Sequence, residues 1–191
     1  MPDVPAVRRP GRPREASVDR RLVEAVLALV RERGPRAVTI AAVSARSGVA
    51  RTTVYRRFPD RRALLVAALS PLTDRGAPPQ DLPVRGKLAW FLAATDEVLH
   101  RGIGPGGIAA LLTEDDPDFT SVLREALEAG LAPVRSEMAA DMAEGRLALR
   151  DPDLVLDLLL GLHLARRLRG VAAVAGDDKT AEQLEQLLGG R

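Results

Sequence analysis

The sequence predicts an all-α protein, with a three-helix helix-turn-helix module near its N-terminus and a larger helical domain after it. Apolar residues make up 46% of the 191 residues but aromatic residues only 3%, so the core must consist mainly of Leu, Val and Ala. Leu and Ala, like the abundant Arg and Glu, favour helices, and few runs of β-branched or aromatic residues favour strands. Apolar residues also recur at three- and four-residue spacing, which is the spacing of one helix face.

The two parts of the chain carry opposite net charge. Residues 1–62 contain 15 Arg, no Lys and 6 acidic residues, a net charge of +9. Because the whole chain carries +2, residues 63–191 carry −7. A basic N-terminal part favours a polyanion as its partner. Double-stranded DNA is favoured over a membrane surface, because no basic amphipathic segment with a Trp or Phe face occurs there.

Residues 1–16 are predicted to form a flexible basic arm. They are rich in Pro and Arg and are expected to form neither a helix nor part of a core. The cationic segment Arg12-Pro13-Arg14 is of the extended kind that lies in a narrow minor groove, so Arg12 and Arg14 are candidate DNA contacts. A solvated tail that makes no such contact is the alternative.

Residues 17–72 predict the helix-turn-helix domain, and residues 39–58 are its central motif. A first helix over 17–33 is followed by a short second helix capped by Thr39, and Gly48 provides the turn. The next helix runs from Arg51 to Arg57, and Asp60 can cap a further one. Two short helices joined by a tight turn suit insertion into a major groove, although an ordinary helical hairpin with solvated arginines is the alternative.

Residues 84–191 predict the second helical domain, after the turn-rich boundary 73–83. The spacing predicts helices over 84–101, 106–113, 118–145, 152–169 and 179–188; the third is either one long helix or one broken near Gly130 and Pro133. Helix 152–169 is apolar nearly all round and must be covered on both sides. A partner chain can cover the second side, or the helix is an unusually buried core helix of a monomer.

Residues 18–72 resemble the N-terminal domain of TetR-family transcriptional regulators. The resemblance rests on the Thr-capped second helix, the Gly48-Val49 turn, the Thr-x-Tyr of the recognition helix, and Phe58-Pro59 followed by basic residues. The chain departs from the family pattern at Ala50, where a Ser or Thr is usual. The resemblance implies a homodimeric, ligand-responsive repressor that holds two recognition helices about 34–36 Å apart on near-palindromic DNA.

The resemblance also implies roles for individual residues of the N-terminal domain. Phosphate contacts are expected from side chains that position the domain, and base contacts from the exposed arginines of the recognition helix, since Arg pairs bidentately with guanine. The expected phosphate contacts are Thr39, Thr53, Tyr55 and Arg61, and the expected base contacts are Arg51, Thr52 and Arg56.

In the C-terminal domain the resemblance implies a dimer interface and an effector site. The last two helices are expected to form a four-helix interface with a second copy, through Leu156, Leu159, Leu160, His163, Leu184 and Leu188. Candidate effector contacts are Trp90, Phe91 and His163. Trp90 could instead only cover a neighbouring helix, and the favoured alternative for His163 is a buried, hydrogen-bonded or interface histidine. A small, hydrophobic effector is expected to displace the helix over 60–70 and so to release the DNA.

Neither catalysis nor a bound cofactor or metal ion is expected. The chain has no Cys and only two His, and it has no paired base and nucleophile. Gly102, Gly104 and Gly107 follow a helix instead of a strand, so we interpret them as a loop, and Glu97-x-x-His100 has no second copy to complete a di-metal site. A cytoplasmic protein without membrane spans is expected. A non-specific architectural DNA-binding protein is the alternative function.

Overall fold

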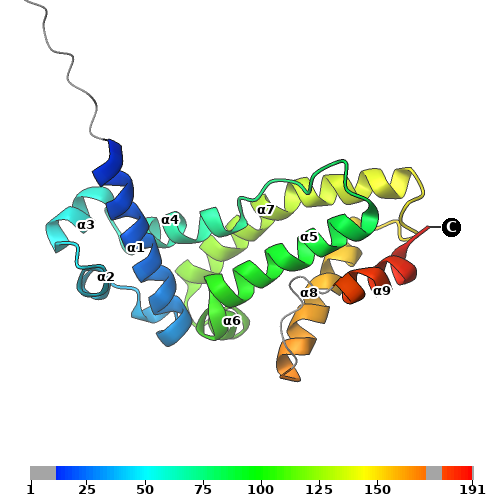
Figure 1. Ribbon diagram of the computed structural model, residues 1–191. Helices are drawn as coiled ribbons and strands as arrows, with labels where there is room; N and C mark the ends of the chain where they lie inside the picture. Colours follow the sequence, from blue (N-terminus) through cyan, green and yellow to red (C-terminus); the bar gives the residue numbers. More distant parts are fainter. Residues whose placement is uncertain (1–11, 171–177, 191) are drawn as a thin grey trace, which may run out of the picture.

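The computed structural model describes residues 12–170 and 178–190, and within these ranges the chain is helical (Figure 1). Helices α1–α4 form one end of the molecule, and α5 and α7 run along the length of the remainder (Figure 1). The described residues contain no β-strand; their one isolated β-bridge joins Leu147 to Gly189. None of the described helices is both long and apolar enough to cross a membrane.

The N-terminal helices are α1 (Arg12–Arg33), α2 (Ile40–Ser47), α3 (Arg51–Arg57) and α4 (Arg61–Thr73), with a short 3-10 turn η1 (Pro35–Ala37) after α1. Side-chain caps fix two of the helix starts. The hydroxyl of Thr39 accepts a hydrogen bond from the Ala42 amide, and the carboxylate of Asp60 accepts one from the Ala63 amide. These caps set the entry into α2 and α4, the helices that flank α3.

Helix α1 begins earlier than the sequence analysis expected. It starts at Arg12 instead of Ser17, so the expectation that residues 1–16 contain no helix is wrong for their last part. Pro13 is compatible with this start, because a proline in the first helical turn removes only an amide that has no helical partner. The rest of the expected arm, residues 1–11, and the side chains of Arg12 and Arg14 lie outside the described part of the chain.

The C-terminal helices are α5 (Val84–Asp96), α6 (Gly104–Thr113), α7 (Pro117–Ala143), α8 (Pro152–Leu168) and α9 (Asp178–Leu188). A π-helical turn, η2 (Glu97–Gly102), follows α5 directly, and the Ile103 amide donates to the Val98 carbonyl there. Helix α7 is one continuous helix with Pro133 inside it, which decides between the two alternatives left open by the sequence.

Gly102, Gly104 and Gly107 form no open loop. Gly102 ends η2, and the other two lie in the first turn of α6. Gly104 has a φ of +59°, and a Cβ on it would lie 2.8 Å from the Arg31 side chain of α1. The earlier interpretation as a loop is therefore wrong. Gly104 needs to be glycine because of its positive φ and its closeness to α1, whereas a Cβ on Gly102 would lie 2.7 Å from the Leu72 side chain of α4.

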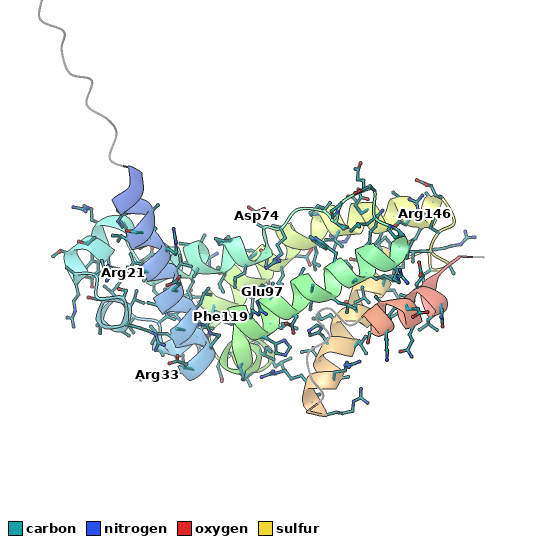
Figure 2. All side chains as sticks on the ribbon, in the orientation of Figure 1. Arg21, Arg33, Asp74, Glu97, Phe119 and Arg146 are labelled. Atoms are coloured by element: carbon teal, nitrogen blue, oxygen red, sulfur yellow. The ribbon has the colours of Figure 1, made fainter. Side chains whose placement is uncertain are left out.

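One hydrophobic core joins the N-terminal helices to the base of the C-terminal domain. It combines buried residues of α1–α4 with Leu99 and Ile103 near η2 and with Phe119 and Leu123 of α7. Phe119 is fully buried and lies where the two parts of the molecule meet (Figure 2). A second core, among α5, α7, α8 and α9, fills the far end of the C-terminal domain. The recognition helix therefore belongs to a rigid unit that continues into α7.

Candidate nucleic-acid interface and effector cavity

The turn before the recognition helix places α3 on the surface of the N-terminal domain. Gly48 adopts a left-handed conformation (φ 67°), which ends α2, and Val49 is buried as an anchor for the turn. Only Val54 of α3 is fully buried. The side chains of Arg51, Thr52, Tyr55 and Arg56 are exposed, Tyr55 by 58%, and Thr53 is half-buried.

Several arginines around α3 hold the helices of this domain together. Arg57 pairs with Asp19 of α1 at 2.5 Å, and Arg46 pairs with Glu32 of α1 through two hydrogen bonds. Arg21 of α1 donates to the Ser47 carbonyl at the end of α2. These contacts fix both α2 and α3 against α1, so the orientation of the recognition helix is set by the scaffold.

Arg51 and Arg56 differ from these scaffold arginines. Both are exposed, and neither forms a hydrogen bond or ion pair with any other described residue. Their guanidinium groups therefore project from a fixed helix without an internal anion to neutralise them. A partner with negative charge or with acceptor atoms can accept hydrogen bonds from these two guanidinium groups, and no contact inside the described part of the chain has to break first.

Arg61 has internal partners that the sequence analysis did not predict. Its guanidinium donates to the carboxylate of Asp116, to the Val38 carbonyl at 3.0 Å and to the Pro35 carbonyl at 2.8 Å. All three of its nitrogens are thus engaged inside the molecule, and the expected phosphate contact stays a prediction. The sequence did not indicate this contact with Asp116, because Asp116 lies 55 residues away from Arg61.

Asp116 is the buried centre of this junction. It caps α7 by accepting from the Phe119 amide, and it is only 6% exposed. Burial alone would raise its pKa, but the hydrogen bonds from Arg61 and from the Phe119 amide outweigh burial and hold the pKa below its usual value. The ionised carboxylate therefore links the start of α4, the turn before α2 and the start of α7.

An apolar cavity of about 180 Å³ lies between the end of α4 and helices α5–α8. Its walls are mostly aliphatic side chains; the polar side-chain atoms among its lining residues are those of Thr73, Arg75, Thr95 and Asp157 and the indole nitrogen of Trp90. Trp90 and Phe91 both line the cavity, whereas His163 does not. The sequence did not indicate that Leu72 and Thr73, the last residues of α4, also line it.

His163 lies behind the cavity, next to two residues that precede it by more than sixty positions. Its Nε2 is 3.3 Å from Oδ1 of Asp96, and its ring centre is 5.5 Å from that of His100. Burial lowers the pKa of His163 below its usual value, even though Asp96 opposes that shift. Glu97, the acidic residue singled out from the sequence, pairs instead with Arg101.

Helix α8 has one face in the protein core and one on the surface. Leu156, Leu159 and His163 pack inside their own chain, and so does Leu188 of α9. The expected interface residues on this inner face are therefore wrong, because a fully buried side chain cannot reach a second copy. Leu160 is 38% exposed and Leu184 is half-buried. The outer face carries Leu154, Leu158, Gly161, Ala165 and Leu168, all exposed.

Replacing Asp116 by Asn should make the free energy of unfolding change less with pH in the acid range. Because the pKa of Asp116 is lowered on folding, its ionised form stabilises the protein above the usual carboxyl pKa, and that contribution is lost as the pH falls through the folded value. We expect a loss of about 2–3 kcal/mol at pH 7 for Asp116→Asn, which shrinks below about pH 4. Urea unfolding across pH 3–7 measures this difference.

The matched control for this variant is Asp118→Asn, since Asp118 is exposed and lies 3.5 Å from the same guanidinium. It should change the free energy of unfolding by less than about 0.5 kcal/mol. An Asp116→Asn variant whose deficit stayed constant down to pH 3 would contradict the lowered pKa.

Comparisons with known proteins agree with this architecture. Residues 22–68 match the family model described as bacterial regulatory proteins, tetR family. A Rhodococcus protein assigned to the TetR family is 18% identical, with a TM-score of 0.66 over 90% of this chain and 98% of the other. A TetR-family transcription regulator from Marinobacter aquaeolei VT8 is 15% identical, with a TM-score of 0.63 over 94% and 100%.

A third similar structure is the transcriptional regulator FadR from Bacillus subtilis, solved in complex with stearoyl-CoA. It is 13% identical, with a TM-score of 0.58 over 87% of this chain and 96% of the other. No curated protein sequence matches the chain. The family model covers the helices that carry the candidate nucleic-acid interface, and the structural similarity extends the same fold over the C-terminal helices. The N-terminal helices therefore match the domain of the tetR family of bacterial regulatory proteins, and the chain as a whole has the fold of the TetR-family regulators named above.

Proposed function

We propose that the protein is a homodimeric repressor that a small apolar molecule releases from its operator. The observation that carries the proposal is the course of α4. Three residues separate the end of α3 from the start of this helix, and its last residues, Leu72 and Thr73, line the apolar cavity. A molecule in the cavity therefore touches the element that follows the DNA-contacting helix.

The exposed residues of α3 are proposed to contact DNA in two ways. Arg51 and Arg56, together with Thr52, are the candidates for base contacts, because these two arginines have no partner in the described part of the chain and Arg pairs bidentately with guanine. Thr39, Thr53 and Tyr55 are the candidates for phosphate contacts, which position the helix without reading sequence.

The outer face of α8 is proposed to form the centre of the dimer. Its exposed apolar stripe is the feature that a second copy would cover, since a patch of leucines rarely stays exposed in a monomer. Gly161 has no heavy atom within 4 Å of a Cβ built on it, and Ala165 lies one turn further along. Two small residues one turn apart allow two helices to approach closely. Leu187 of α9 is 75% exposed and would add to the same interface, in which α8 and α9 of one copy meet α8 and α9 of the other.

Effector binding is proposed to act by moving the end of α4. The start of α4 is held by Arg61 and Asp116, whereas its end borders the cavity. A molecule that prefers a larger space there shifts the protein toward a different spacing of the two recognition helices, and DNA affinity falls in proportion to that preference. A coupling of about 1–3 kcal/mol corresponds to about 5–150-fold in affinity.

The cavity walls favour an uncharged or weakly polar, largely aliphatic effector. The polar lining residues include one basic and one acidic side chain, Arg75 and Asp157, so the lining offers no net charge to a strongly ionic ligand. A similar structure, FadR from Bacillus subtilis, holds stearoyl-CoA. This supports an acyl or other aliphatic group as the portion that would enter the cavity.

The recognition helix can be tested by selecting binding sites from random DNA at physiological salt and then measuring variants on the selected site. We expect a near-palindrome with two half-sites about one turn apart. Arg51→Ala should cost about 1–3 kcal/mol and relax preference at one base position. Tyr55→Phe should weaken binding to all sequences alike. Selection of A·T-rich tracts alone would favour the architectural alternative.

Arg33→Ala is the matched control for the recognition helix. Arg33 is an exposed arginine at the end of α1, and it lies well away from α3 (Figure 2). It should leave both specific affinity and base preference unchanged. If Arg51→Ala lowered specific and random-DNA affinity equally, Arg51 would contact phosphate and not a base.

Leu158→Glu should break the dimer without unfolding the chain, because Leu158 is 45% exposed on the outer face of α8. Sedimentation would then show a monomer with unchanged helix content, and operator affinity would fall. Ala109→Glu is the control, since Ala109 is an exposed apolar residue of α6 that does not line the cavity. A Leu158→Glu protein that remained a dimer would place the interface on another surface.

Gly130→Ala should imitate the effector. A Cβ at Gly130 of α7 would lie 2.5 Å from the Thr73 carbonyl at the end of α4, so the two helices must separate there. Operator affinity without effector should fall about 5–150-fold. Ala132→Ser, at an exposed position of the same helix, should leave affinity unchanged. Unaltered affinity in a folded Gly130→Ala protein would refute coupling through the end of α4.

A further inference from the structure

Asp96, His100 and His163 form a compact cluster beside the effector cavity. Asp96 is the last residue of α5, His100 lies in the π-helical turn η2, and His163 comes from α8. One ligand atom of each lies within 4.8 Å of those of the other two. Asp96 and His163 are buried, and His100 is partly exposed, so the cluster is reached from the His100 side. Glu97, labelled in Figure 2, marks the turn where η2 begins.

The hydrogen bonds within the cluster leave nitrogen atoms unused. Nδ1 of His100 is buried and lies 2.6 Å from Oδ1 of Asp96, but it forms no hydrogen bond with any described residue. Nδ1 of His163 is also buried without a hydrogen-bond partner in the described part of the chain. Buried polar atoms without partners are rare in folded proteins, and a bound ion is one of the standard reasons for them.

The donor set has the composition of a transition-metal site. Two imidazoles and one carboxylate are the ligands that Zn²⁺, Co²⁺ and Ni²⁺ accept, and three protein ligands leave a coordination position open. The Asp96–His100 spacing of i, i+4 puts two ligands on one face of a helical segment, and α8 supplies the third from across the bundle. The nearby Arg166 donates to the hydroxyl of Thr180, on the side of α9.

We propose that Asp96, His100 and His163 bind one divalent first-row transition-metal ion, with Zn²⁺ as the reference ligand. The ion would join η2 to α8, and its open coordination position would be available to water or to a donor atom of a small molecule. Thr95, Val98, Leu99 and Leu164 line the cavity and neighbour the three ligands in sequence, so the ion lies in the wall of the proposed effector site. The proposal does not depend on DNA binding or on the identity of the effector.

The test measures metal binding by the untagged full chain at pH 7.5. The protein is stripped with a chelator and titrated with Zn²⁺ by calorimetry, and Co²⁺ is added in parallel to record its visible absorption bands. The sequence has only two histidines and no cysteine, so imidazole ligands to the metal ion can come only from His100 and His163, and no thiolate can bind it. We expect one Zn²⁺ per chain, tetrahedral or five-coordinate Co²⁺ bands, and a higher melting temperature with Zn²⁺.

His100→Ala and Asp96→Asn are the decisive variants, and Asp157→Asn is their control. His100 is partly exposed and its replacement leaves the core intact, whereas His163 is buried and its replacement could unfold α8. Both decisive variants should bind Zn²⁺ about 100-fold more weakly or worse, and they should lose the Zn²⁺-dependent rise in melting temperature. Asp157→Asn removes a carboxylate from the cavity wall outside the cluster and should bind as the unaltered chain does.

Two results would overturn the metal site. The first is an unaltered chain that binds no Zn²⁺ or Co²⁺ in excess. The second is folded His100→Ala protein that binds Zn²⁺ as tightly as the unaltered chain, because the ion would then be held by other carboxylates. Histidine side-chain NMR separates the cases further: both imidazoles should shift on addition of one Zn²⁺, and shifts of neither would refute their ligation.

Discussion

The arginine–carboxylate contact between Arg61 and Asp116 is the constraint on which the arrangement of the two domains depends. It fixes the first turn of α4 to the first turn of α7, and the same guanidinium holds the carbonyls of Pro35 and Val38 before α2. Burial disfavours the charged carboxylate, but the hydrogen bonds it accepts more than offset that cost, as its lowered pKa reports. Breaking one side of such a contact leaves a buried charge without a partner, so the junction resists independent motion of the domains.

Because this contact holds only the start of α4, the end of α4 is the part that can move. At Thr73 the helix meets Gly130 of α7 so closely that no side chain fits between them, and the cavity opens beside the same two residues. A helix fixed at its start and displaced at its end rotates instead of sliding. In the proposed mechanism this rotation acts through Arg61 on the segment before α2, and the scaffold pairs of Arg46 and Arg57 carry α2 and α3 with it as one unit.

The sequence predicted the parts of the structure that depend on local chemistry and failed where distant residues decide. The capped starts of α2 and α4 and the left-handed turn at Gly48 follow from residues within a few positions of one another, and all three were predicted. The fate of Arg61 depends on Asp116, and the surroundings of His163 depend on Asp96; no periodicity reports either pairing. The interface residues predicted on α8 were wrong for another reason: a helix that is apolar all round has no polar face to show which side is buried.

The two faces of α8 place the proposed dimer contact and the cavity wall on a single helix. Leu156, Leu160 and Leu164 line the cavity, while Leu158, Gly161 and Ala165 are exposed on the outer face. A side chain that moves to admit an effector on one face must therefore shift a helix whose other face is packed against a second copy. Close-packed interfaces do not deform gradually, so such a shift would be shared by both protomers. In the proposed dimer, an effector in one cavity would then change the spacing of both recognition helices. The single metal ion proposed at Asp96, His100 and His163 would stiffen α8, the helix that transmits this change.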